Sequence, residues 1–389
     1  MNPLEKKTVL VVDDAPANIQ VVNSILKDIC KVRVATDGAK ALVLVKTEPS
    51  PDLILLDVIM PGIDGYEVCT RLKADPATAD IPVIFLTVQK ESEEETHGFE
   101  VGAVDYIHKP FSPAVVKARV QTHLVLRGIR EVLARQLDAL RKELESARQI
   151  QLSILPTHLP QIRGLDIAAR YIPANSIGGD FYDFIVIDEQ RLGILIADVS
   201  GHGMAAALIS SMLKIALSTQ VANAADPAKV LCGLNQALCG KFDHHFVTAS
   251  YLLVDLEKRT LTYAGAGHPP MWLWGAPIEG VREEAENGLF LGTFPWATYS
   301  SVQLLLREDT WILLYTDGVS EAANPAEEEF GTTRFREFLP GCQSDSANQF
   351  ADRLVAELSS WVARGPGTES NDDVSFVAVH VGGPITPGK

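Results

Sequence analysis

Residues 196–208 read IADVSGHGMAAAL, and this stretch decides how the second half of the chain is interpreted. An apolar run ends at Asp198, a glycine-rich turn follows, and a helix of small residues begins at Met204. Three chemistries fit this corner: Ser200 and His202 as a nucleophile and its base, the glycines as a phosphate-binding loop, or Asp198 as a metal ligand. The rest of the chain has to distinguish them.

Length and charge limit the possible classes of protein. The 389 residues exceed what one hydrophobic core usually organises, so we expect two or three domains. A net charge of −16 disfavours a nucleic-acid partner, because such proteins neutralise phosphates with basic surface. The five scattered cysteines lack CxxC spacing and indicate buried thiols. No signal peptide and no apolar run of about 18 residues is found, so we expect a cytoplasmic protein that does not bind membranes.

The first 120 residues have the pattern of a parallel α/β sheet. Short β-branched apolar runs alternate with helical stretches, and the runs end in carboxylates or other polar groups. The clearest runs are TVLVVDD (8–14), PDLILLDV (51–58), IPVIFLT (81–87) and AVDYIHKP (103–110). We expect residues 1–120 to form one α/β domain.

A long polar helix is predicted over residues 112–156, ending at Pro156. Apolar residues recur every seven positions, with two leucines between them: Leu126, Leu133, Leu140, Ala147 and Ile154, with Leu137 and Leu144. A helix of about 40 residues with so narrow an apolar seam is not buried by itself. We therefore expect either a dimeric coiled coil, which we favour, or a helix docked on a neighbour.

The remainder of the chain indicates a second, α+β domain over residues 157–383, followed by a disordered tail at 384–389. Strands are grouped with their own helices rather than alternating regularly with them. The expected strands lie in 165–173, 191–200, 248–256, 259–267, 309–318 and 373–381, and two amphipathic helical stretches lie near 205–240 and 346–364.

Polar groups follow the strands of the first domain at their carboxyl ends, where open α/β sheets bind ligands. These groups are Asp13 and Asp14, then Asp57, Thr87 and Lys109. Clustered carboxylates repel one another unless a cation lies among them, and Mg²⁺ prefers oxygen ligands. A carboxylate in such a site can attack a phosphoryl group while a hydroxyl and an ammonium neutralise the phosphoryl oxygens.

The motif LLDVIMPGIDGYE (55–67), with VVDD before it and LT and KP after it, resembles the receiver domain of two-component response regulators. The resemblance implies a flavodoxin-like, five-stranded parallel sheet and a histidine kinase or phosphotransfer protein as partner. It also implies the site residues: Asp57 accepts the phosphoryl group, Asp13 and Asp14 help to hold Mg²⁺ with it, Thr87 and Lys109 contact the phosphoryl group, and Tyr106 is the aromatic switch residue. Val88 is bulkier than the family's usual residue, and we expect it to alter access to the phosphoryl group.

The second domain carries four acidic sites beside strand edges. They are Asp180 in SIGGDFYDF, Asp198, Asp317 in LLYTDGVSEA, and Asp372 with Asp373 in ESNDDVSFVAV. Oxygen ligands without a matching set of histidines or cysteines favour Mg²⁺ or Mn²⁺ over zinc, and two such ions can share a carboxylate. The pattern therefore predicts metal-assisted hydrolysis of a phosphoester.

Five ordered motifs resemble the PPM (PP2C-like) serine/threonine phosphatases of the bacterial SpoIIE and RsbU type, over about residues 145–382. They are ARQIQLSILP, GGDFYD, ADVSGHGMAAAL, GAGHPP, and YTDG with NDDVSF. The resemblance implies two packed β-sheets flanked by helices and two Mn²⁺ or Mg²⁺ ions. It implies that Asp198 bridges the ions with the Val199 carbonyl as a further ligand, that Asp317 and Asp372 bind from the other side, and that Asp180 lies on or next to the metal shell.

Other reactive side chains receive plainer interpretations. A metal-activated water makes a Ser200 and His202 nucleophile unnecessary, and the glycines permit a tight turn because no GK[ST] follows. We expect His268 to be structural and His244 and His245 to lie in a solvated loop.

The leading hypothesis is a response regulator in which phosphorylation of Asp57 controls a phosphatase through the 112–156 helix. By family resemblance its substrate is a phosphorylated anti-sigma antagonist (STAS) protein, in a stress or stationary-phase circuit that regulates a sigma factor. The architecture also resembles RssB-type regulators of the stationary-phase sigma factor, so the alternative is an adaptor that binds a sigma factor for proteolysis without turnover. The presence of all four acids favours the enzyme, because clustered carboxylates cost stability unless metal neutralises them.

Overall fold

The structure is a computed structural model that describes residues 7–88, 92–174, 177–242, 244–276, 278–362 and 372–382. Its contacts divide the chain into two compact units, Met1–Leu140 and Arg141–Lys389. The disordered tail expected at 384–389 lies outside the described residues. No helix in the described part of the chain is both long enough and apolar enough to span a bilayer.

The first unit contains a parallel sheet of five strands, which confirms the predicted fold. The strands are β1 (Thr8–Val12), β2 (Lys31–Ala35), β3 (Leu53–Asp57), β4 (Val83–Thr87) and β5 (Asp105–His108). They lie in the order β2-β1-β3-β4-β5. The helices are α1 (Pro16–Leu26), α2 (Gly38–Val45), α3 (Gly65–Ala74), α4 (Ser92–Glu100) and the first turns of α5 (Pro113–Ile154).

Helices cover both faces of this sheet, which explains why its central strands are apolar throughout. One hydrophobic cluster joins the sheet to α2 and α3, and the other joins it to α1 and the start of α5. Val116 and Val120 of α5 are fully buried in the second cluster. Strand β2 was not among the clearest predicted strands, because it is a partly exposed edge strand whose sequence KVRVA carries two charges.

Helix α5 confirms the long helix expected after the first domain, and it is 42 residues long. Its first part belongs to the first unit and its last turns belong to the second. The predicted heptad leucines between these parts, Leu126, Leu133, Leu137 and Leu140, are exposed on the single chain.

The second unit contains two mainly antiparallel sheets. The first sheet has the order β13-β10-β9-β8-β7, with β14 also paired to β10: β7 (Phe181–Val186), β8 (Arg191–Val199), β9 (Val247–Asp255), β10 (Thr260–Ala266), β13 (Asn287–Gly288) and β14 (Val302–Leu305). The second has the order β12-β11-β15-β16-β6: β6 (Leu165–Ile172), β11 (Met271–Gly275), β12 (Val281–Glu284), β15 (Thr310–Tyr315) and β16 (Val374–Val381). All six predicted strands are present, together with β7, β11, β12, β13 and β14, which were not predicted.

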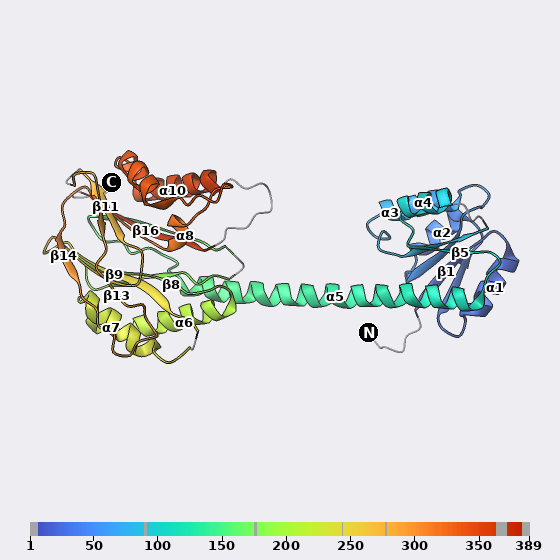
Figure 1. The fold of residues 1–389 in the computed structure, drawn as a ribbon, viewed down its shortest axis with the longest axis horizontal. Helices are drawn as coiled ribbons and strands as arrows, with labels where there is room; N and C mark the ends of the chain where they lie inside the picture. The colour runs from blue at the N-terminus through green and yellow to red at the C-terminus, as the bar shows by residue number, and fades with distance from the viewer. Residues whose placement is uncertain are drawn as a thin grey trace. The chain divides into compact units, whose positions relative to one another are not determined.

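Helices flank the two sheets on their outer sides (Figure 1). The helices α6 (Met204–Ser218) and α7 (Pro227–Leu238) pack on the first sheet, and α9 (Gly331–Phe338) and α10 (Ala347–Val362) cover the second. A single helical turn, α8 (Asp317–Ser320), follows β15. This confirms the expected α+β fold of two packed sheets with flanking helices.

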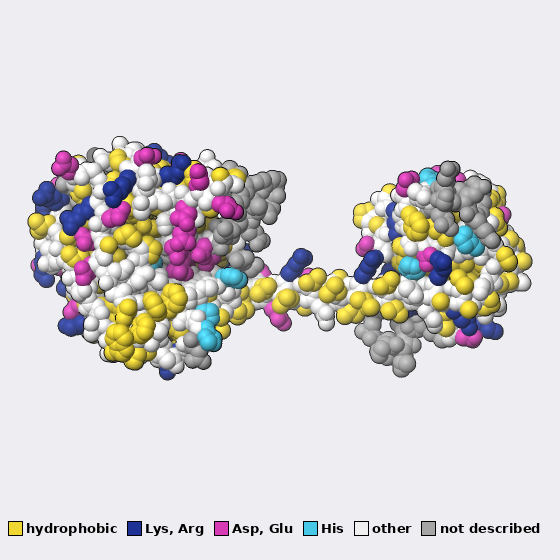
Figure 2. All heavy atoms as spheres, viewed as in Figure 1, with side chains coloured by type: hydrophobic (Ala, Val, Ile, Leu, Met, Phe, Trp, Pro, Cys, Tyr) yellow, Lys and Arg dark blue, Asp and Glu magenta, His cyan; other side chains and the backbone are white. Residues whose placement is uncertain are grey.

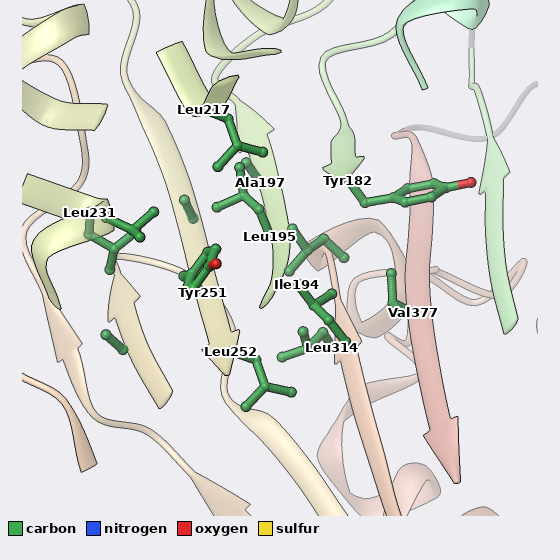
Figure 3. Close-up of a cluster of buried hydrophobic side chains, with 14 of the residues drawn as sticks. Tyr182, Ile194, Leu195, Ala197, Leu217, Leu231, Tyr251, Leu252, Leu314 and Val377 are labelled. Atoms are coloured by element: carbon green, nitrogen blue, oxygen red, sulfur yellow. The ribbon is translucent and has the colours of Figure 1, made fainter. Parts of the chain in front are cut away.

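The packed sheets share one continuous hydrophobic core. In Figure 3, Ile194 and Leu252 of the first sheet lie near Leu314 and Val377 of the second. On the other face of the first sheet, Leu217 comes from α6. This core fixes the ends of β8, β15 and β16, which carry the acidic side chains described below.

Candidate functional site

Three carboxylates of the first unit come together at the carboxyl end of the sheet. Asp13 and Asp14 directly follow β1, and Asp57 ends the neighbouring strand β3. Oxygens of the three side chains lie within 4.8 Å of one another, close enough to hold one metal ion. Lys109 directly follows β5, and its Nζ atom donates to Asp13 and to Asp57 at 2.8 Å each.

The electrostatics of this cluster balance burial against one ammonium. Burial raises the pKa of Asp57, the hydrogen bond from Lys109 opposes the rise, and the nearby Asp13 charge adds to it. Burial alone lowers the pKa of the Lys109 ammonium, but its bonds to the two carboxylates outweigh burial and leave that pKa raised. The cluster therefore keeps its negative charge in part because a lysine lies within it.

Backbone and side-chain donors orient Asp13, which is fully buried. Its Oδ1 atom accepts from the Ala15 amide at 2.9 Å, and the Asn18 side-chain amide donates to both carboxylate oxygens at 3.0 and 3.1 Å. Sequence reasoning missed Asn18, although its position in the first turn of α1 after an acidic strand end is a signal for such a contact.

The remaining predicted receiver residues lie on the last two strands. Thr87 ends β4 and is buried, whereas Val88 beside it is exposed. Tyr106 of β5 is buried, with its ring centroid 5.2 Å from that of Phe99. A Cβ atom at Gly98 of α4 would lie 1.5 Å from the Tyr106 hydroxyl oxygen, so the tyrosine occupies space that only a glycine leaves open.

Strand β5 also contacts α5 directly. The Asp105 carboxylate, next to Tyr106, accepts a hydrogen bond from Arg119 and lies 3.2 Å from the His123 Nε2 atom. Adjacent residues of a strand point to opposite faces, so Tyr106 contacts the α4 side while Asp105 contacts α5. A change around Tyr106 therefore has a short physical route to α5.

In the second unit, acidic side chains from both sheets meet at one edge of the packed sheets. Asp180 directly precedes β7, Asp198 is near the end of β8, and Asp317 begins α8 after β15. Asp372 and Asp373 precede β16, whose first residues pair with the end of β15. Figure 2 shows acidic side chains gathered on the face of this unit that carries α8.

Burial and mutual repulsion disfavour ionisation of these carboxylates. Burial, then Asp317 and Asp372, raises the pKa of Asp198 to about 7. Burial and the Asp198 charge raise the pKa of Asp180 well above its ordinary value. Burial also raises the pKa values of Asp317 and Asp372. Among the described residues, no lysine or arginine forms an ion pair with Asp180, Asp198 or Asp317.

The chemistry of the donor set suits divalent cations, but among the described residues no three of these acids have oxygens within 4.8 Å of one another, as Asp13, Asp14 and Asp57 do. The set offers several carboxylates and no thiolate, and it lacks the ammonium that balances the first cluster, so bound cations would remove the repulsion between the acids. The Val199 carbonyl can join this set because Gly179 makes room for it: a Cβ atom at Gly179 would lie 2.6 Å from the Val199 oxygen. Mg²⁺ and Mn²⁺ both suit such oxygen ligands.

Asp373 has a different role from its neighbour Asp372. It is buried, and its carboxylate accepts from the backbone amides of Ala174 at 2.8 Å and Gly179 at 2.6 Å. Asp180 in turn accepts a hydrogen bond of 2.7 Å from the Thr316 hydroxyl. Sequence reasoning noted Asp373 only as the second acid of a pair and missed Thr316, because neither contact is local in sequence.

Ser200 and His202 do not form a nucleophile and base pair in the described residues. The Ser200 hydroxyl oxygen accepts from the Phe246 amide at 2.9 Å. The His245 Nδ1 atom lies 2.7 Å from the Ser200 carbonyl oxygen. Both histidines lie in a loop, as expected; His244 is exposed, whereas His245 is partly buried against the ADVSGHG turn.

His268 is buried in the loop that follows β10. Its Nδ1 atom is 3.0 Å from the Thr248 hydroxyl, and burial lowers its pKa to about 3. A neutral imidazole fixed in this way cannot exchange protons near neutral pH.

Comparison with known proteins gives the family. Residues 188–382, half of the chain, match the model of Stage II sporulation protein E (SpoIIE), and residues 9–121 match the response regulator receiver domain. The chain belongs to the SpoIIE family. It combines a receiver domain with a SpoIIE-type domain of PP2C-like fold.

Individual relatives cover parts of this SpoIIE-family chain. The phosphoserine phosphatase RsbU of Bacillus subtilis is 34% identical over 52% of this chain and 58% of its own length. A probable cyclic di-GMP phosphodiesterase of Vibrio cholerae is 43% identical over 37% of this chain and 32% of its own length. The chain thus spans less than two thirds of these curated relatives. The SiaA-PP2C domain of Pseudomonas aeruginosa has the same fold, with a TM-score of 0.56 at 23% identity, over 64% of this chain and 99% of that domain.

Proposed function

We propose that this protein is a response regulator whose receiver controls a metal-dependent protein serine/threonine phosphatase. The observation that carries the proposal is the meeting of Asp180, Asp198, Asp317 and Asp372 at one edge, with raised pKa values. Acids arranged in this way cost stability unless cations neutralise them. Membership of the SpoIIE family and the likeness to a phosphoserine phosphatase support the same activity.

Each acid has a stated role in this proposal. Asp198 would be the ligand shared by two Mg²⁺ or Mn²⁺ ions, Asp317 and Asp372 would be further carboxylate ligands, and the Val199 carbonyl and Asp180 would complete the set. When bound, such ions activate water and neutralise the phosphate ester that it attacks. The Thr316 hydroxyl donates to Asp180 and would orient it in this site.

The receiver has the groups needed to accept a phosphoryl group from a histidine kinase or phosphotransfer protein. In this proposal Asp57 is the acceptor, Asp13 and Asp14 hold Mg²⁺ with it, and Lys109 and Thr87 contact the phosphoryl oxygens. Lys109 already donates to Asp57. Tyr106 and then Asp105 transmit the change to α5 through the Arg119 and His123 contacts.

The proposed substrate is a phosphoserine or phosphothreonine on a STAS-type anti-sigma antagonist, which sets the availability of a sigma factor in a stress or stationary-phase circuit. The likeness to RsbU, a phosphoserine phosphatase, supports the class of substrate. We also propose a homodimer through the exposed leucines of α5, since Leu126, Leu133, Leu137 and Leu140 recur at coiled-coil positions. In analytical sedimentation we expect wild type to be a dimer and Leu133→Glu to be a monomer. A wild-type monomer contradicts the proposed homodimer.

The experiment that tests the activity measures phosphate release from a phosphorylated STAS protein with Mn²⁺. Wild type should release phosphate, and the rate of release by Asp198→Ala should be at least about 100-fold lower. Asp188→Ala is the matched control, because Asp188 is exposed and pairs with Arg191 away from the acids. No Mn²⁺-dependent difference between wild type and Asp198→Ala overturns the enzyme proposal and leaves the adaptor hypothesis.

A separate experiment tests whether the receiver controls phosphate release. Beryllofluoride, which mimics a phosphoryl group on an aspartate, should change the rate of phosphate release in wild type and leave Asp57→Ala unaffected. An equal response in the two proteins contradicts the proposed control.

A further inference from the structure

The last turn of α5 carries a buried glutamine that binds the loop before β7. Gln151 is 4% exposed, although α5 is mostly solvent-exposed around it. Its Nε2 atom donates to the Gly178 carbonyl, and its Oε1 atom accepts from the Gly178 amide at 3.2 Å. One side-chain amide therefore satisfies both backbone groups of a single residue.

The next residue of this loop is held just as fully. The Gly179 carbonyl accepts a hydrogen bond of 2.6 Å from the Ser210 hydroxyl of α6, and the Gly179 amide donates to Asp373 at 2.6 Å. Both Ser210 and Asp373 are buried. Every backbone donor and acceptor of the two glycines thus has a side-chain partner from a distant part of the sequence.

Close packing leaves no room for a side chain at either glycine of this loop. A Cβ atom at Gly178 would lie 1.8 Å from an Asp373 carboxylate oxygen, and one at Gly179 would lie 2.6 Å from the Val199 carbonyl oxygen. Asp180 follows directly and accepts its hydrogen bond from Thr316. The loop that Gln151 holds therefore places two groups of the acid cluster, the Asp180 carboxylate and the Val199 carbonyl.

We propose that Gln151 is a positioning residue that sets the affinity of the acid cluster for divalent cations by holding Gly178. This inference rests on the proposed function, in which the acid cluster binds such cations. Gln151 does not touch the cations in this scheme, and it acts through Gly178 and Gly179 on Asp180 and Val199. Groups that orient metal ligands typically contribute 10- to 100-fold to affinity, which sets the size of the expected effect.

A purely structural role predicts a different result. If Gln151 only satisfied two buried backbone groups, its loss would lower the melting temperature of the cation-free protein and leave the cation affinity unchanged. The affinity for Mn²⁺ is therefore the deciding measurement, and it does not depend on turnover.

The experiment titrates the full chain with Mn²⁺ by calorimetry. Binding that disappears in Asp198→Ala belongs to the acid cluster, which separates it from binding by the receiver. In Gln151→Met, which keeps the length of the side chain without its amide, we expect the dissociation constant of that binding to rise about 10- to 100-fold. Gln149→Met is the matched control, since Gln149 is exposed on the same turn, and its affinity should stay within about twofold of wild type.

Three results overturn the inference. They are a Gln151→Met affinity within about twofold of wild type, an equal loss in Gln149→Met, and no Asp198-dependent binding in wild type. If Gln151→Met melts too low to titrate, Gln151→Asn, whose amide is one methylene too short, replaces it with the same expectation. Wild type that binds Mn²⁺ through Asp198 but releases no phosphate contradicts the proposed function alone, and the affinities still decide the role of Gln151.

Discussion

The two acidic clusters of this chain solve the same electrostatic problem in different ways. Asp13 and Asp57 share one ammonium, because Lys109 lies 2.8 Å from each of them. Asp180, Asp198 and Asp317 have no lysine or arginine ion pair in the described part of the chain. The difference is visible in the pKa of Asp198, which burial and its acidic neighbours raise to about 7.

This comparison indicates how strongly each cluster depends on metal. The Lys109 ammonium inside the first cluster offsets part of the repulsion between Asp13 and Asp57 without any bound cation. In the described part of the chain, Asp180, Asp198 and Asp317 have no basic side chain as an ion-pair partner, so protons or cations have to neutralise them.

Removal of divalent cations should have the largest effect, and it should act on the second cluster. We expect EDTA to lower phosphate release by about 1,000-fold, equivalent to about 4 kcal/mol, because the acids then repel one another and no cation activates water. Excess Mn²⁺ should restore the rate. The measurement is phosphate release against free Mn²⁺, and full activity in EDTA contradicts the role of the cluster.

Loss of the lysine should remove the advantage of the first cluster. We expect Lys109→Met to lower the free energy of unfolding of the first unit by about 3 kcal/mol without Mg²⁺, because two buried carboxylates lose their partner. Mg²⁺ should recover part of the loss. Urea unfolding followed by circular dichroism measures it, and Lys40→Met, at an exposed ion pair, should cost at most about 0.5 kcal/mol. Equal costs in the two variants contradict the prediction.

The pH dependence of stability should report the second cluster. The pKa of Asp198 is raised from 3.8 to about 7 in the folded protein. The folded state then binds a proton more tightly than the unfolded state, so its stabilising contribution is complete below about pH 4 and is lost as the pH rises towards 7. We expect the cation-free second unit to lose about 2 to 4 kcal/mol over this range through Asp198.

Tryptophan fluorescence can measure that loss, because all five tryptophans lie beyond residue 270 and report on the second unit. Asp198→Asn should flatten the pH dependence, whereas Asp188→Asn, at an exposed site, should keep it. Equal changes in the free energy of unfolding of wild type and Asp198→Asn between pH 5 and 7 would falsify the interpretation.

The smallest effect should come from removal of the Thr316 hydroxyl. This neutral group donates to an acid of the second cluster, as Lys109 does in the first. Thr316 donates to Asp180 and accepts from the Ser375 amide at 3.0 Å. We expect Thr316→Val to cost about 1 to 2 kcal/mol, because both partners are buried. Thr219→Val, at an exposed residue of the second unit whose hydroxyl donates to the Ala216 carbonyl, should cost less than about 0.5 kcal/mol in the same unfolding measurement. Indistinguishable costs mean that Thr316 does not hold Asp180.

Much of the fold was predictable because its signals are local. The buried strands β1, β3 and β4 are continuous apolar runs, and α5 has a sustained seven-residue repeat. Most of the strands that were missed are short or lie at edges: β12 and β14 have four residues each, β13 has two, and β7 ends its sheet. Such strands form only when a neighbouring strand pairs with them. Strand β11 is a fully buried interior strand, and its run MWLWG was missed because five apolar residues without flanking periodicity do not distinguish a strand from a buried turn of helix.

Local motifs were enough to predict which chemical groups this protein brings together. Motifs such as IADVSGHG and LLDVIMPG put acids at strand ends, where the backbone delivers them to one edge of a sheet. The surroundings of those acids depend on contacts between distant segments of the folded chain. Lys109 reaches Asp13 across 96 residues of sequence, and Gln151 reaches Gly178 across 27. Such contacts depend on strand order and on the packing of helices against sheets, which no local pattern encodes, so the balance of charge in each cluster follows from the fold.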